Sequence, residues 1–186
     1  YLDNEGAMNY HTLSRIHNFH LKIYAAMFLG QFASAMNAVE ELIKTTPEEL
    51  LRIENPAMAD WMEAYIGIKA HVFIRFGKWQ EIIDQELPAD QTLYARTTAL
   101  WCYAKSIAYA ATGDLNSAEL HQDLFLGAVE KVPATRYMFN NTCLDVLKIA
   151  EQMVSGEIEY RKGNFETAFK HLRKAVFLDD NLIYDE

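Results

Sequence analysis

Apolar residues recur along the chain with the spacing of amphipathic helices rather than with the alternation of strands. Long stretches are apolar at positions three and four residues apart, and no stretch shows the strict alternation of a half-buried strand. The pattern therefore predicts an all-α protein. The helices that we expect lie near residues 8–29, 32–45, 57–76, 79–86, 90–112, 115–130, 134–162 and 165–177.

The turns between these helices repeat a short phrase that begins with glycine. The turn glycines are Gly30, Gly77, Gly113 and Gly163. Five residues after each of them comes a residue that is small in three of the four units, namely Ala35, Ile82, Ala118 and Ala168. A long apolar-periodic helix precedes each glycine and a shorter one follows it. Such self-similarity indicates a helical repeat protein, in which neighbouring units bury a shared core.

The last unit, residues 149–181, resembles a tetratricopeptide repeat over its whole length. Gly156 stands where that family keeps a small residue so that two helices cross closely, and Ala168 and Ala175 occupy the small positions of the second helix. The resemblance implies a right-handed superhelical solenoid of antiparallel helix pairs with a concave groove. We expect one array over residues 1–186, cut from a longer protein, with repeats at about 16–47, 63–88, 99–133 and 149–181.

The units are unevenly spaced, because two of them carry extra residues. One surplus falls in residues 46–56 and is long enough for one helical turn. Thr46 before Pro47, with two glutamates after it, indicates a capped helix start. The other surplus falls in residues 131–141, where we expect Pro133 to restart the chain as a long helix.

Composition excludes some classes of binding partner but says little about the fold. Of the 186 residues, 51% are hydrophobic, which is enough for a sizeable core, and the net charge is −9. We expect no nucleic-acid partner, because binding to phosphates needs a basic face. No apolar run reaches the roughly 20 residues of a membrane span. Cys102 and Cys143 form no Cys-x-x-Cys pair, and we expect a cytoplasmic protein that binds no membrane.

Candidate binding residues follow from the resemblance, because in that family the first helix of each pair lines the concave groove. Helical spacing along those helices selects the residues that point inward. They bring histidines, tyrosines and two arginines to one surface of an acidic chain. The candidate groove residues are His17, His20, Tyr24, His71, Arg75, Tyr103, Glu157, Tyr160 and Arg161.

A peptide is one kind of ligand that fits these residues. Arg75 and Arg161 are suited to a carboxylate, and the tyrosines offer stiff amphipathic contact area. Packing between long helices is an equally good interpretation of the tyrosines. Chaperone-binding members of the family hold a peptide carboxylate with lysines and asparagines at fixed positions. That set is absent here, so we do not expect that particular partner.

A metal is the second kind of ligand. His17 and His20 lie three residues apart, a spacing that lets two imidazoles share a metal, and His71 is a third candidate ligand. Glu157 or Glu63 is expected nearby. Ordinary hydrogen-bonding histidines at a helix interface are the plainer interpretation, because no His-Glu-x-x-His motif or cysteine pair accompanies them. We therefore assign no metal and no cofactor.

Catalytic motifs are missing from the chain: it has no phosphate loop, no Gly-x-Ser-x-Gly elbow and no placed cysteine–histidine pair. We expect no enzyme activity. The phrases Tyr10-His11, His17-Asn18-Phe19-His20 and His71 to Trp79 resemble a group of bacterial tetratricopeptide-repeat proteins with no assigned activity. Histidines recur at matching places in that group, which favours a functional groove.

The function that we expect is a non-catalytic scaffold that binds a protein or peptide in the concave groove. The alternative is a metal- or small-ligand-binding domain centred on the groove histidines, with or without hydrolytic activity. Self-association through terminal repeats is a third hypothesis. An open groove would favour the first, a groove closed by residues 46–56 and 131–141 the second, and burial of helix 165–177 against a second copy the third.

Overall fold

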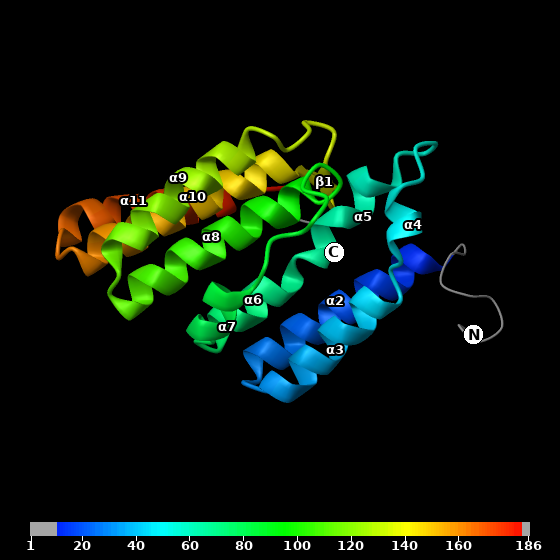
Figure 1. The fold of residues 1–186 in the computed structure, drawn as a ribbon, viewed down its shortest axis with the longest axis horizontal. Coiled ribbons are helices and arrows are strands. Elements are labelled where there is room, and N and C mark those ends of the chain that lie inside the picture. Colours follow the sequence, from blue (N-terminus) through cyan, green and yellow to red (C-terminus); the bar gives the residue numbers. More distant parts are fainter. Residues whose placement is uncertain (1–10, 184–186) are drawn as a thin grey trace.

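The computed structural model describes residues 11–183, and most of its regular structure is helical (Figure 1). The all-α class is therefore confirmed, with one addition, a short two-stranded hairpin. The elements are α2 (Thr12–Phe28), α3 (Phe32–Lys44), α4 (Glu48–Leu51), α5 (Met58–Ile66), α6 (Ile68–Arg75), α7 (Trp79–Asp84), α8 (Ala95–Thr112), α9 (Leu115–Val129), β1 (Tyr137–Met138), β2 (Asn141–Thr142), α10 (Cys143–Arg161) and α11 (Phe165–Asp179). The start of the first expected helix, residues 8–10, lies outside the described residues.

The turn glycines all adopt the left-handed conformation. Their φ angles are 71° at Gly30, 64° at Gly77, 91° at Gly113 and 83° at Gly163. Each glycine N–H donates to the carbonyl three residues back, and the next N–H donates to the carbonyl five residues back, as from Asp114 to Tyr109 (3.0 Å). This is a Schellman helix end, which favours glycine because a Cβ atom is strained at positive φ. The recurrence of the turn is confirmed.

Helix pairs stack side by side, and their first helices form one layer (Figure 1). α2 packs on α3, α6 on α7, α8 on α9, and α10 on α11. Within the layer of first helices, α2 contacts α6, α6 contacts α8, and α8 contacts α10. The surface of this layer is therefore shared by all the pairs.

Helix α8 is buried around most of its circumference. It contacts α6, α7, α9 and α10, and its alanines at 95, 99, 104, 108 and 110 are all buried. Small side chains let several neighbouring helices approach one helix at once. A polar residue in such a helix is consequently carried into the interior.

Gly156 lets α10 and α11 cross closely. A Cβ atom at this position would lie 2.7 Å from Leu172 Cδ2 and 3.3 Å from the carbonyl oxygen of Ala168. Ala168 and Ala175 on the facing side of α11 are both buried. The small residues expected at this crossing are confirmed.

The helix expected over residues 57–76 is divided at Gly67 into α5 and α6. A Cβ atom on Gly67 would lie 2.9 Å from Leu100 Cδ2 and 3.0 Å from Arg96 Nη1. The backbone therefore approaches α8 at this point more closely than a larger residue allows.

Two further helices begin later than expected. α8 starts at Ala95 rather than near residue 90, because the Asp90 side chain accepts hydrogen bonds from the amides of Thr92 (3.2 Å) and Leu93 (3.0 Å) and holds a turn. The helix expected over residues 134–162 begins only at Cys143. Thr142 caps it by accepting from the Asp145 amide (3.1 Å), and the hairpin takes the preceding residues.

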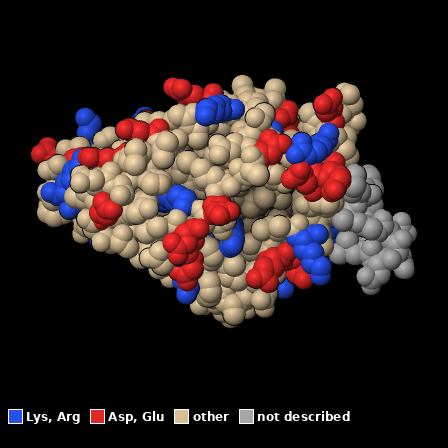
Figure 2. All heavy atoms as spheres, in the orientation of Figure 1, with Lys and Arg blue, Asp and Glu red and all other residues tan. Residues whose placement is uncertain are grey.

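The surplus residues 46–56 contain α4, the single helical turn that was expected there. Arg52 at its end pairs with Glu48 (2.7 Å) and with Asp90 (2.8 Å) on the exterior. On the face drawn in Figure 2, acidic and basic side chains are interspersed. No helix within residues 11–183 is long and apolar enough to span a bilayer.

Helix α11 leaves apolar side chains on its outer face. Phe169 is 43% exposed, Val176 60% and Phe177 57%. An apolar face of this kind is compatible with self-association, which stays a prediction for this chain.

Candidate functional site

The hairpin places an aromatic residue between α2 and α5. Tyr137 pairs with Thr142 and Met138 with Asn141, which leaves Phe139 and Asn140 as a two-residue turn. Phe139 has a φ of 55°, a conformation that costs a residue with a Cβ atom about 1–2 kcal/mol. Strain of this kind persists only where the surroundings impose it, and it concentrates at functional sites.

Ring contacts on several sides hold Phe139 in this conformation. The centroid of its ring lies 5.6 Å from that of His17, 5.7 Å from that of His20 and 5.4 Å from that of Tyr65. His20 also packs edge-on against Tyr65 (5.2 Å) and against Tyr24 (4.9 Å). The hairpin turn is thereby fixed against the first-helix layer, so the surplus residues 131–141 partly close the inner face.

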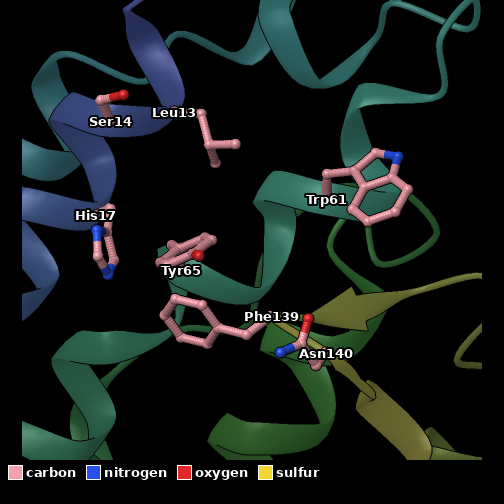
Figure 3. A pocket seen from close by; sticks show the side chains of 7 residues that line it. All are labelled: Leu13, Ser14, His17, Trp61, Tyr65, Phe139 and Asn140. Atoms are coloured by element: carbon pink, nitrogen blue, oxygen red, sulfur yellow. The ribbon is translucent and has the colours of Figure 1, made fainter. Parts of the chain in front are cut away.

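On one side of the hairpin turn lies an open cleft of about 400 Å³, which we call the α2–α5 cleft (Figure 3). Figure 3 shows α2, α5 and the hairpin turn each contributing to its wall. Its lining residues are Leu13, Ser14, His17, Trp61, Tyr65, Phe139 and Asn140. Trp61 is 53% exposed, and its ring stacks on Tyr137 with centroids 5.5 Å apart. The cleft is thus a largely aromatic surface that is open to solvent.

On the other side lies a smaller pocket of about 260 Å³, which we call the Arg96 pocket. Its polar lining residues are Tyr24, His71, Arg96, Tyr103 and Asp179. Its apolar lining residues are Leu100, Met138, Val146, Leu147, Ile149, Ala150, Met153 and Leu182. Met138 lines this pocket, whereas the next residue, Phe139, lines the cleft. The hairpin is therefore the wall between the two sites.

Glu63 anchors the elements that carry both sites. Its carboxylate, fully buried, accepts from the amides of Thr97 (2.7 Å) and Arg96 (3.3 Å) at the start of α8. Arg136, just before the hairpin, donates to the same carboxylate (3.3 Å) and pairs with Asp60 (3.1 Å). A carboxylate is well placed at a helix N-terminus, where amides lack partners and the helix dipole is positive. Glu63 therefore joins α5, α8 and the hairpin.

Arg96 is the charged group of the pocket that bears its name. It is 2% exposed, and its guanidinium donates to the carbonyl of Ala64 (2.9 Å) and to Met138 Sδ (3.7 Å). Among residues 11–183 no carboxylate lies within ion-pairing distance of this guanidinium. Its charge acts instead on the ionisable groups around it.

Burial and the nearby Arg96 charge keep two histidines neutral. Burial first, and then Arg96, lower the pKa of His20 to about 4 and that of His71 to about 3. His20 Nε2 has no hydrogen-bond partner among the described residues. Burial raises the pKa of Tyr24, and burial together with the Glu157 charge raises the pKa of Tyr103 to about 12. At neutral pH both phenols keep their protons.

The structure brings some of the predicted groove residues together. His17 lies in the α2–α5 cleft, and Tyr24, His71 and Tyr103 line the Arg96 pocket. His20 lies between the two sites and is only 6% exposed. The first-helix layer therefore does gather these side chains, but it divides them between two sites.

The other predicted groove residues are not among the lining residues of either site. Glu157 and Arg161 pair with each other along α10 (2.8 Å). Tyr160 packs on Phe165 next to the last turn, with ring centroids 5.2 Å apart. Arg75 is exposed at the end of α6. Arg75 and Arg161 therefore line neither site, and the arginine that lines the pocket is the buried Arg96.

The histidines do not form a metal centre with their described neighbours. Within residues 11–183, no three histidine, cysteine, aspartate or glutamate side chains are grouped as a metal would require. His17 packs on Phe139, and Glu63 is taken up by the amides of α8 and by Arg136. The geometry gives no support to the metal hypothesis.

Sequence reasoning missed the residues that shape the sites, above all Arg96, Trp61, Tyr65 and Phe139. The burial of Arg96 could have been predicted, because apolar residues lie on every side of its helix and such a helix is buried. Phe139 left a weaker signal, since two asparagines follow it and asparagine is typical of tight turns.

Comparisons with family models, with curated proteins and with solved structures found no match for the chain.

Proposed function

We propose that the chain is a non-catalytic binding module built as a tetratricopeptide-like, right-handed superhelical array. Two observations support the array: each helix pair turns through the same Schellman glycine, and the first helices stack in one layer. In such an array the surface of the first helices is the place for a partner.

The partner that we propose for the α2–α5 cleft is a peptide segment that inserts an apolar side chain. The observation that carries this proposal is the exposed aromatic wall of the cleft, in which Trp61 is 53% exposed beside Leu13 at 48%. Large aromatic side chains contribute most of the binding energy at many interfaces, because they bury much area and lose little entropy. Tyr137 stacked behind Trp61 holds that ring in place.

Selection from a displayed library of short random peptides tests this proposal, followed by titration of the selected peptides. We expect Trp61→Ala to weaken binding by roughly 30-fold, as a central aromatic contact does. Phe28→Ala is the matched control, because Phe28 is an aromatic residue that is 81% exposed and does not line the cleft. The proposal is wrong if no peptide is enriched, or if Trp61→Ala binds the selected peptides as well as the wild type does.

A second candidate function is a small-ligand-binding domain, and the hairpin favours it. Residues 46–56 and 131–141 were expected to close the groove in a domain of that kind. The turn at Phe139 lies against the first-helix layer, whereas no residue of 46–56 lines either site. The Arg96 pocket behind the hairpin, at about 260 Å³, lies just below the usual size range of ligand pockets, roughly 300–1,000 Å³. It is too small for a folded partner.

A further inference from the structure

The molecule contains two buried arginines that differ in how their charges are compensated. Arg136 is 6% exposed and is paired with Asp60 (3.1 Å) and Glu63 (3.3 Å). Arg96 is 2% exposed, and within residues 11–183 its guanidinium has only neutral acceptors, the Ala64 carbonyl and the Met138 sulfur. Buried charges are normally paired, because removing an ion from water without a counter-ion is costly.

From this difference we infer that the Arg96 pocket binds a small molecule that has one carboxylate and an apolar body. The inference rests on the second candidate function and names its ligand. A guanidinium presents paired N–H donors in a plane that matches a carboxylate, so Arg96 is suited to this anion. The ligand carboxylate takes the place that Asp60 and Glu63 have at Arg136.

The polar groups around Arg96 agree with an anionic ligand. His71, which also lines the pocket, is neutral because burial and the Arg96 charge lower its pKa to about 3. Tyr24 and Tyr103 keep their phenol protons and are available as donors. Arg96 is thus the one positive charge among the described lining residues at neutral pH.

The remaining wall of the pocket selects the body of the ligand. Leu100 on α8 and Leu147, Ala150 and Met153 on α10 are apolar. Burial of apolar ligand atoms against them is favourable by about 25 cal/mol for each Å² removed from water. The volume of about 260 Å³ limits the body to a short alkyl chain or a single ring.

Asp179 at the exposed rim of the pocket limits the charge of the ligand. It is the last residue of α11, and its carboxylate repels a second negative charge. A monocarboxylate is therefore favoured over a dicarboxylate or a phosphate ester, even though all of them have oxygens that match Arg96.

Calorimetric titration with benzoate and hexanoate, each compared with its amide, tests the inference on the full chain. We expect both acids to bind and each amide to bind at least about ten-fold more weakly, because the amide lacks the charge that Arg96 recognises. Succinate and phenyl phosphate are expected to bind more weakly than the monocarboxylates.

Four variants, of which Ala33→Leu is a control, locate the binding. Arg96→Met should remove the preference for acid over amide. Ala150→Leu should abolish binding by filling the pocket, whereas Ala33→Leu on the exposed side of α3 should not. Asp179→Asn should tighten binding of the acids a few-fold, with the gain smaller at high salt. The last three variants keep the test decisive where Arg96→Met fails to fold.

The possible failures are distinguishable. Equal binding of acid and amide, lost in Ala150→Leu, would refute the carboxylate and leave a neutral-ligand pocket. Absence of binding by every probe, or binding unchanged by Ala150→Leu, would refute the pocket itself. Carboxylate binding should be unaffected by Trp61→Ala, so failure of the peptide proposal does not carry over to it.

Discussion

The α2–α5 cleft and the Arg96 pocket lie on the same layer of helices but present opposite chemistry. The cleft is open and aromatic, with Trp61 half exposed, and none of its described lining residues is an acid, a lysine or an arginine. The pocket is smaller and mostly aliphatic, with a buried guanidinium. The wall between them is a single turn, in which Phe139 faces one site and Met138 the other. The hairpin therefore separates two sites on the first-helix layer.

The largest expected effect breaks both sites together, because both depend on Glu63. Replacing Glu63 with alanine leaves Arg136 with fewer counter-charges and the first amides of α8 without their acceptor. We expect the free energy of unfolding to fall by about 3–5 kcal/mol, as when one partner of a buried ion pair is removed. Urea denaturation measures this loss. Glu41→Ala, at an exposed residue, is the control, and we expect it to change stability by less than about 1 kcal/mol.

The second largest effect is a loss of folding stability at acid pH, which arises in the first-helix layer. The folded-state pKa of His20 is lowered to about 4, so the unfolded chain binds the proton more readily. The contribution of neutral His20 to stability is therefore complete above the unfolded-state pKa near 6.5. It is lost progressively as the pH drops toward 4. The expected loss from His20 is on the order of 3 kcal/mol, and His71 adds to it.

Thermal or urea melts of wild type and His20→Phe between pH 8 and pH 4 measure this dependence. The variant should match the wild type in stability at pH 8, since His20 Nε2 makes no hydrogen bond in the described part of the chain. It should lose less stability at pH 4. Parallel curves for the two proteins would show that His20 titrates normally.

Truncating the Phe139 side chain should open the wall between the two sites. Phe139→Ala removes the ring contacts with His17, His20 and Tyr65, and we expect a cost of about 2 kcal/mol for this half-buried side chain. Phe139→Gly removes the same ring and also relieves the strain of the positive φ. The glycine variant should therefore be at least as stable as the alanine variant. The reverse order, measured by urea denaturation, would argue against strain at this turn.

The smallest expected effect perturbs the Arg96 pocket and leaves the cleft unchanged, because α10 forms a wall of the pocket but not of the cleft. Gly156→Ala should destabilise the α10–α11 crossing by about 1–2 kcal/mol, since its Cβ atom would lie 2.7 Å from Leu172. Hydrogen exchange should rise in α10 and α11 and stay unchanged in α2 and α5. Gly127→Ala on α9 has no atom within 4 Å of the new Cβ, and we expect it to stabilise by about 0.5–1 kcal/mol.

The limits of prediction follow the range of the interactions involved. The pairs around Gly30, Gly77, Gly113 and Gly163 were predictable, because a left-handed helix end is a local demand on one residue. The start of α10 was not predicted, although Thr142 and Asp145 form a recognisable cap, because Pro133 also suggested a helix start. Tyr24, His71 and Tyr103 were placed on the inner face by helical spacing, and the same spacing also selected Tyr160 and Arg161, which have local partners instead.

The sequence by itself determined the helix pairs, their turns and the close crossing at Gly156, because each depends on residues near one another along the chain or on a single missing side chain. The tertiary structure decided which charges are compensated and where the sites lie. Glu63 meets Arg96 and Arg136 only after α5, α8 and the hairpin have packed together. Phe139 acquires its conformation from side chains on α2 and α5. Those contacts join distant segments, and only packing brings such segments within reach of one another.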